Sequence, residues 1–328
     1  MTAANSSLLS EALPRTGQVC RSTADLPANR FYPFNRLPEK SMAPEPADTQ
    51  APSDDSLDAG VAAWVDAFEN CDWPVLASPA EALEDWRDNE DAADAHLLAD
   101  CMADDPLMTL KLLRHVARLQ GSREHTDAET ATEALVMLGI TPFFRAFGPQ
   151  PSIELVLQDQ TDALLGLFAV LRRAERASRF ALGFAVLRLD RDAAVIHQAA
   201  LLHDFVELLL WVHAPDKALQ IQRTLEREPE LSLAQAQRLC LQVDLADVQH
   251  ALMQRWRLPE LLVRISDEHE SPLRQVLNVQ LAIRLARHSA AGWLHPALTD
   301  DVDQISALLN LATEPTLQLV HELDGLTG

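Results

Sequence analysis

The sequence predicts an all-α protein, a compact bundle of many helices, and three features of the chain support this. Leu and Ala are abundant, whereas there are only 10 glycines and 1 tyrosine in 328 residues. Runs rich in Val, Ile, Thr and aromatic residues, which favour strands, are hard to find. From about residue 58 onward, apolar residues recur at helical spacing. Because no fixed-period repeat is visible, we expect a globular bundle rather than a solenoid.

Residues 1–57 differ in composition from the rest of the chain. They hold seven prolines interleaved with Ser, Thr, Asp and Ala. Such a segment buries too little apolar area to offset the entropy lost on ordering, so we expect a disordered Pro-rich tail. Its apolar cluster, Phe-Tyr-Pro-Phe at residues 31–34, could dock on the folded part or on a partner.

Helix signals follow in order after this tail. Residues 58–68 carry an apolar stripe along one helix face. The next helix begins at Pro106, because proline fits the first turn, and stops at Gly121. A helix over 130–138 ends at Gly139, and another begins at Thr141 and Pro142. Further helices are expected at about 161–187, 192–213, 215–228, 232–240, 244–255, 259–268, 272–290, 300–310 and 314–323.

The charge of the chain disfavours two classes of partner. The chain has 27 Lys and Arg against 49 Asp and Glu, a net charge of −22. Nucleic-acid phosphates and anionic lipids both attract Lys and Arg, so we expect no nucleic acid and no membrane as partner. A basic partner, or solubility alone, fits this charge better.

The cysteines and the apolar runs bear on the compartment. Cys20, Cys71, Cys101 and Cys240 form no CxxC pair, which disfavours a thiolate zinc site and a disulfide framework. No uncharged apolar run of 18 residues and no secretory signal is visible, so we expect no transmembrane helix. We therefore expect a cytoplasmic protein.

A nearly continuous apolar stretch at residues 199–211 contains the adjacent pair His203 and Asp204. This predicts one helix over 192–213 that is buried on most sides. Histidine and ionised aspartate are costly to bury unless they are paired or bind a metal. His197 and Glu207 would share a polar stripe with them on this helix. His197 and Asp204 are two turns apart, roughly 10 Å, so one metal ion would need ligands from elsewhere.

Four segments follow one another along the chain: DDPLMTLKLLR at 104–114, EALVMLGI at 133–140, LLHD at 201–204 and WRLP at 256–259. In this order they resemble the HDOD family, the HD-related output domains of bacterial signalling proteins, over roughly residues 70–290. His269 lies where the family often ends a later helix. The resemblance implies a helical domain, which we place at 58–295. Helices within 296–328 would pack on this core or extend it.

The chain departs from the family pattern at polar positions. The family commonly continues Ile-Gly-Lys after the His-Asp pair, where this chain has Phe-Val-Glu at 205–207. HD phosphohydrolases, which the family resembles distantly, hold a divalent cation with an upstream histidine, the His-Asp pair and a later aspartate. No histidine lies between His125 and His197, although Asp244 or Asp247 could serve as the later aspartate. The His-Asp pair is therefore structural or vestigial, part of a pocket for a small ligand, or part of an active metal site.

Two further clusters suggest function. Arg172, Arg176 and Arg179 share one helix face beside Arg173 and could dock an acidic or phosphorylated partner. The alternative is a solvated face that acidic neighbours partly neutralise. Trp211, Trp256 and Trp293 are expected as core anchors, with a ligand pocket as the alternative. The histidines His250, His269, His288 and His295 match no known metal-ligand spacing.

The function implied by the resemblance is regulatory and non-catalytic: signal transduction through an unidentified protein partner, with no cofactor and no metal. Two alternatives remain. One is a divergent metal-dependent phosphohydrolase or phosphodiesterase acting on a nucleotide, which needs at least two more His or Asp side chains near His203 and Asp204. The other is a small-ligand sensor. No Gly-rich phosphate loop and no nucleophile elbow is present.

Overall fold

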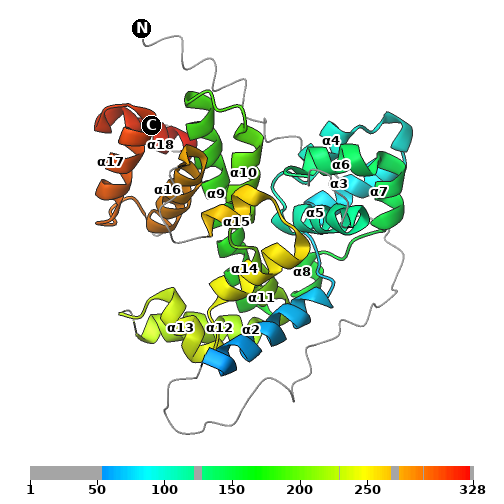
Figure 1. The fold of residues 1–328 in the computed structure, drawn as a ribbon, viewed down its shortest axis with the longest axis horizontal. Helices are drawn as coiled ribbons and strands as arrows, with labels where there is room; N and C mark the ends of the chain where they lie inside the picture. Colours follow the sequence, from blue (N-terminus) through cyan, green and yellow to red (C-terminus); the bar gives the residue numbers. More distant parts are fainter. Residues whose placement is uncertain (1–53, 122–127, 229, 267–272, 291, 326–328) are drawn as a thin grey trace.

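Helices make up nearly all of the regular structure. The computed structural model describes residues 54–121, 128–228, 230–266, 273–290 and 292–325. Within these ranges the β-type pairing is one isolated bridge, between Val75 and Ser152. The prediction of an all-α fold is therefore confirmed (Figure 1).

The helices after the first form a group on one side of the molecule (Figure 1). They are α3 (Ala77–Arg87), η1 (Glu90–Ala92), α4 (Ala95–Cys101), α5 (Pro106–Gln120), α6 (Ala131–Leu138) and α7 (Ile140–Ala146). The carboxylate of Asp105 caps α5 by accepting hydrogen bonds from the backbone of Leu107 and Met108, and Pro106 occupies the first turn. Sequence analysis assigned no helix to residues 77–101, so α3, η1 and α4 were missed.

A second group is built around the long helix α9 (Thr161–Leu187). It contains α10 (Ala193–Leu202), α15 (Glu260–Ile265), α16 (Arg274–His288), α17 (Leu298–Leu309) and α18 (Thr313–Leu323). α9 packs against α10, α16 and α18, and α17 packs against α16. The C-terminal helices, in the segment expected to pack on or extend the core, thus lie directly on α9 and α16.

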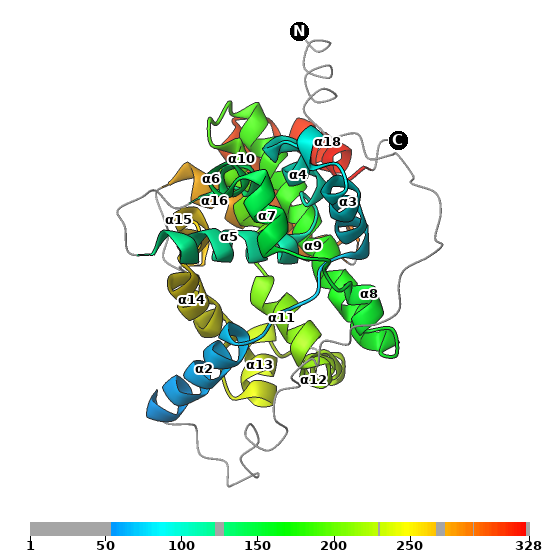
Figure 2. The ribbon, with the colours of Figure 1, turned by 90° about the vertical axis from the view of Figure 1, so that its right-hand side faces the viewer.

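The third group lies below the other two in Figure 1. It contains α2 (Asp54–Glu69), α11 (Phe205–His213), α12 (Pro215–Arg227), α13 (Leu233–Leu241) and α14 (Leu245–Trp256), with the short α8 (Ile153–Val156) nearby. Figure 2 shows α2 beside α14, against which it packs. α2 begins at Asp54, so its first four residues fall within the segment expected to be the tail. The rest of the predicted tail, residues 1–53, lies outside the described residues.

The apolar segment expected to be one helix over 192–213 is two helices. α10 ends at Leu202, α11 begins at Phe205, and His203 and Asp204 form the turn between them. Nδ1 of His203 lies 2.6 Å from the carbonyl oxygen of Ala200. In a continuous α-helix the backbone N–H of Asp204 would donate to this carbonyl, so the histidine ring competes with the helical hydrogen bond.

By length and composition alone, this segment could cross a membrane. Residues Ala193–His213 satisfy that test, and 78% of the most apolar window is buried inside the protein. A mostly buried core helix passes the same test, and the side chains of α11 pack against α9, α12 and α14. The apolar character of this segment is therefore explained by its place in the core.

Candidate functional site

His203 and Asp204 lie where the group around α9 meets the third group, and both residues are buried, with 5% and 7% of their surface exposed. Both oxygens of the Asp204 carboxylate accept hydrogen bonds from arginines. Nε and Nη2 of Arg173 on α9 donate to Oδ2 at 3.1 and 2.9 Å, and Nη2 of Arg287 on α16 donates to Oδ1 at 2.8 Å. Asp204 therefore ties α9 and α16 to the turn between α10 and α11.

The electrostatics of this turn keep Asp204 ionised. Burial by itself raises the pKa of a carboxyl group because it removes water from the charged form. The positive charges around Asp204 outweigh burial and hold the pKa of its carboxyl well below the usual value. The carboxylate therefore acts as the central anion of a buried ion-pair network.

The side chain of His203 makes its contacts within the turn itself. Nδ1 is hydrogen-bonded to the carbonyl of Ala200, and Nε2 lies 2.9 Å from Oδ2 of Asp204 without the alignment of a hydrogen bond. This second contact is attractive when the ring carries a proton on both nitrogens. The backbone carbonyl of His203 accepts a hydrogen bond from Gln249 on α14 at 2.8 Å.

Glu207 extends the network by one helical turn. Its Oε2 accepts a hydrogen bond from Nη2 of Arg173 at 2.7 Å, so Arg173 bridges Asp204 and Glu207. Burial raises the pKa of the Glu207 carboxyl even though Arg173 acts in the opposite direction. Burial likewise disfavours the charged form of Arg173, but Glu207 and Asp204 outweigh this and raise the pKa of its guanidinium.

The donors near the pair do not fit a divalent metal. In the part of the chain that the structure describes, no group of three or more His, Cys, Asp or Glu side chains is placed to hold a metal ion. Asp204 has both oxygens engaged by guanidinium groups. Asp244, one candidate for the later aspartate, caps α14 and pairs with Arg238 at 2.9 Å. His197 is half-buried on α10, where burial lowers its pKa and the charge of Asp104 acts in the opposite direction.

The predicted arginine face is divided among different roles. Arg172 is exposed, and Arg179 lies 3.9 Å from Glu175. The Arg176 side chain is mostly buried and makes a bidentate pair with Asp324, just after α18, at 2.7 and 2.9 Å. The prediction that these three arginines share one docking face is therefore wrong for Arg176, because the C-terminal helices cover its position on α9.

Sequence analysis did not single out the two arginines that pair with Asp204. Arg173 was set apart from the predicted docking face, and Arg287 was not considered. They lie 31 and 83 residues from Asp204 in the sequence, so no local spacing points to them. The cost of burying His203 and Asp204 did indicate that the pair needed a neighbouring partner or a metal.

The three tryptophans have separate surroundings. Trp256 is buried beside Trp73 and Phe205, at ring centroid distances of 5.6 and 5.8 Å. Trp293 is half-buried and packs edge-on against His321 at 4.4 Å. Trp211 is buried and lines a surface groove.

The remaining predicted histidines and cysteines show no common site. His250 is exposed beside Gln254, whereas His288 pairs with Asp301 and stacks on His295. Of the cysteines, Cys71, Cys101 and Cys240 are free thiols. His269 and Cys20 lie outside the described residues.

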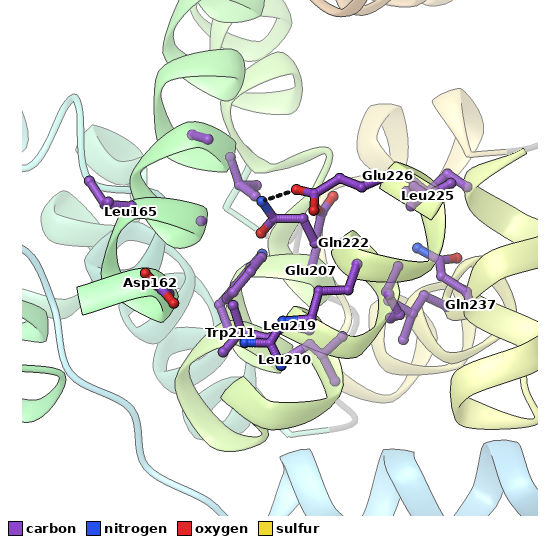
Figure 3. Close-up of a pocket in the computed structure, with 18 of the residues that line it drawn as sticks. Asp162, Leu165, Glu207, Leu210, Trp211, Leu219, Gln222, Leu225, Glu226 and Gln237 are labelled. Atoms are coloured by element: carbon purple, nitrogen blue, oxygen red, sulfur yellow. Dashed lines mark hydrogen bonds between the residues drawn. The ribbon is translucent and has the colours of Figure 1, made fainter. Parts of the chain in front are cut away.

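The groove beside Trp211 has a volume of about 550 Å³ and is enclosed by α9, α11, α12 and α13 (Figure 3). Arg173 and Glu207 line it, so the ion-pair network forms part of its wall. Other lining side chains are mainly apolar, including Leu210 on α11 and Leu219 on α12. The His-Asp turn thus lies behind this groove, and the exposed edge of its network reaches the groove.

Comparison with known families gives a match to the HDOD domain over residues 74–272, more than half of the chain. The chain belongs to the HDOD family. The match spans the motifs on which the sequence resemblance was based, from the helix after Asp105 to the Trp-Arg-Leu-Pro turn. Comparison with curated protein sequences finds no match.

Two solved structures share this HDOD fold. The MmoQ response regulator from Methylococcus capsulatus str. Bath is 20% identical, with a TM-score of 0.57; the alignment covers 76% of this chain and 97% of that protein. A virulence factor from Campylobacter jejuni subsp. jejuni is 17% identical, with a TM-score of 0.54 and coverage of 82% and 93%. At these identities the likeness shows the fold alone.

Proposed function

We propose that this HDOD protein is a cytoplasmic, non-catalytic regulatory module of signal transduction that acts by binding another protein. The observation that carries the proposal is the state of Asp204. Both of its carboxylate oxygens pair with guanidinium groups, so the aspartate of the His-Asp motif joins helices. The module's surface, rather than a reaction centre, is then the part that transmits a signal.

The competing function, a metal-dependent phosphohydrolase, needs a different arrangement. Water activation at a divalent cation requires several convergent oxygen or nitrogen ligands and an open coordination position. A cation would have to displace Arg173 and Arg287 from Asp204. The mostly buried Arg173 would then keep Glu207 as its one carboxylate partner, and losing a partner at a buried site is energetically costly.

The fold likeness agrees with a signalling role. MmoQ, whose structure this chain resembles, is named a response regulator. The net charge of −22 suits a partner that presents basic residues, as electrostatic steering between opposite charges speeds association.

The proposal is tested by measuring bound metal and turnover together. Purified protein is analysed for transition metals, Mg and Ca, and is then assayed against nucleoside phosphates and cyclic dinucleotides with added Mn²⁺ or Mg²⁺. Asp204→Asn is the diagnostic variant, and Asp91→Asn, an exposed acidic position in η1, is the matched control. We expect far less than one metal per chain and no turnover. Stoichiometric metal and phosphate release that only Asp204→Asn abolishes would overturn the proposal.

A further inference from the structure

The groove beside Trp211 is the strongest candidate for a binding surface in the described part of the chain. One wall is the exposed face of α9, from Asp162 to Arg173, and the opposite wall is α12 with the start of α13. Figure 3 shows Asp162 and Leu165 on one side, Leu225 and Glu226 on the other, and Glu207 between them. The floor contains Leu210 and Trp211 of α11, so the groove is apolar at its base.

The walls of the groove are held in place by close packing. Gly166 on α9 faces the indole of Trp211 so closely that a Cβ at this position would lie 2.2 Å from Cη2 of the ring. At the deep end, Arg173 is fixed by its pairs with Asp204 and Glu207. A preformed groove loses little conformational entropy on binding, so more of the interaction energy contributes to affinity.

Large apolar side chains on both rims remain exposed. Leu165 on α9 is 63% exposed and Leu233 at the start of α13 is 40% exposed. Leu165 and Leu233 both line the groove and, with Leu210 and Trp211 on its floor, form one apolar surface. This surface suits the apolar face of a helix about 10 Å in diameter.

The charged groups around this apolar surface are mainly carboxylates. Asp162 and Glu226 stand on opposite rims. Glu207 accepts a hydrogen bond from Arg173 through Oε2, while no described residue hydrogen-bonds to its Oε1. Arg173 is neutralised by Asp204 and by Glu207 itself, so the other charged lining residues are Asp162 and Glu226 against the exposed Arg223. Glu226 also accepts a hydrogen bond from Gln222 at 3.1 Å. The groove therefore offers carboxylate oxygens to a cationic side chain that enters beside an apolar one.

We propose that this groove docks an amphipathic helix of a partner protein, with leucine-like side chains on the groove floor and Lys or Arg side chains against Glu207, Asp162 and Glu226. The inference rests on the protein-binding function proposed above and names its surface and the chemistry of its partner. Helix-in-groove recognition places anchors at i, i+3 or i+4, and i+7, which lets apolar and basic positions alternate across one face.

The test uses a pair of synthetic helical peptides of about 15 residues, long enough to form a marginal helix alone. One carries Leu on one face and Lys on the flanks, and the other has Glu in place of every Lys. Each is fluorescein-labelled and titrated with the full-length protein by fluorescence anisotropy. We expect the Leu/Lys peptide to bind at micromolar concentration and the Leu/Glu peptide to bind at least about 10-fold more weakly, a difference of about 1.4 kcal/mol.

Matched variants locate the binding. The double substitution Leu165→Ser and Leu233→Ser should weaken the Leu/Lys peptide about 10-fold, roughly the effect of two partly buried leucines. Leu119→Ser, a 64% exposed leucine at the end of α5, removes a similar side chain in another helix group and should change the affinity less than twofold. Circular dichroism confirms that each variant is folded. Glu226→Gln should weaken the Leu/Lys peptide but not the Leu/Glu peptide.

Three results would overturn the docking proposal: no binding of the Leu/Lys peptide, equal binding of both peptides, or equal weakening by Leu119→Ser and the groove variants. None of them touches the proposed non-catalytic function, because that function is judged by metal content and turnover. Conversely, metal-dependent turnover with normal peptide binding would remove the non-catalytic function and leave the groove assignment in place.

Discussion

Asp204 shows how a buried carboxylate is accommodated between helices. The carboxylate is buried, and a buried ionised group is tolerated only when its charge is paired and its hydrogen bonds are made. Arg173 and Arg287 supply both conditions. The sequence indicated that a buried Asp204 needs a partner, and the two arginines meet that need.

Replacing Asp204 with Asn should strongly destabilise the protein. The variant keeps the shape of the side chain but leaves Arg173 with Glu207 as its remaining carboxylate partner, and breaking a buried pair in this way costs about 3–5 kcal/mol. Because Glu207 remains, we expect a loss near 3 kcal/mol in the free energy of unfolding, measured by urea denaturation. Arg172→Gln, at an exposed position beside Arg173 on α9, should change the free energy of unfolding by less than about 0.5 kcal/mol. A loss below that level for Asp204→Asn would contradict the ion-pair account.

His213 gives the folded state a specific sensitivity to acid. Burial lowers the pKa of this imidazole to about 4, and its Nε2 has no hydrogen-bond partner among the described residues. In the unfolded chain the imidazole takes up a proton below about pH 6.5, whereas in the folded protein it does so near pH 4. His213 therefore supports stability fully above about pH 6.5, and this contribution is lost as the pH falls toward 4.

The prediction is a difference between two pH profiles. Between pH 7 and pH 5 the unfolding free energy of the wild type should fall by roughly 2 kcal/mol more than that of His213→Gln. Other groups, such as Asp105 with its pKa raised to about 6 by burial, act in both proteins and cancel in the comparison. Parallel profiles from denaturation at each pH would show that His213 is not buried as described.

At the scale of single elements, helix ends were easier to predict than the turn inside the apolar segment. Pro106, Gly121 and Gly139 marked boundaries that the structure places within a residue. The break at His203 has no Gly or Pro that would mark it in the sequence. The ring of His203 and arginines far away in the sequence stabilise it instead. The composition around residues 77–101 gave no strong periodicity, so α3 and α4 were missed. The site depends on contacts between residues far apart in the sequence, which local patterns do not encode.

The caps of α5 and α4 form a matched pair for measuring the effect of burial. Asp105 is fully buried and accepts hydrogen bonds from Leu107, Met108 and also Leu76, which joins the loop before α3 to α5. Asp94 caps α4 through one hydrogen bond, from Leu97, at an exposed site. Asp105→Ala should cost about 2–3 kcal/mol, because it removes a cap and strands buried N–H groups, and Asp94→Ala about 1 kcal/mol. Equal losses in urea denaturation would argue against a special role for Asp105.

The close approach of α9 and α11 depends on one glycine. Gly166→Ala places a Cβ inside the van der Waals radius of the Trp211 ring, which is held by its neighbours. We expect a loss of about 1–3 kcal/mol and a lower Tm in calorimetry, in spite of the better helix propensity of alanine. Gly148→Ala is the control, because a Cβ there meets nothing within 4 Å. Unchanged stability of Gly166→Ala would mean that the helices can separate freely at this point.

At the scale of the whole molecule, the C-terminal helices complete the core around α9. They follow the end of the family match at residue 272. Leu323 packs so closely on α9 that a Cβ at Gly183 would lie 2.6 Å from its side chain. Arg176 pairs with Asp324 and also donates a hydrogen bond to Ser289 at 2.7 Å. The segment after residue 296 therefore packs directly on the core.

Loss of the Arg176 pair should loosen α18 before it affects the rest of the fold. In Asp324→Asn, the charge that holds Arg176 is removed, and local opening should become easier by about 1–3 kcal/mol. Hydrogen exchange followed by mass spectrometry should show faster exchange in residues 313–323, with α5 and α11 unchanged. Asp216→Asn, at an exposed position on α12, is the control. Uniform acceleration along the chain would instead indicate that α18 opens only with global unfolding.

The Arg176–Asp324 pair joins residues that are 148 positions apart, and this has a consequence for synthesis in the cell. At about 5–20 residues per second, a ribosome makes Asp324 roughly 7–30 seconds after Arg176. During that interval the Gly183 face of α9 has no α18 to cover it. A nascent chain at this stage presents an apolar face beside an unpaired arginine, a surface on which chaperones or neighbouring nascent chains compete with the protein's own last helix.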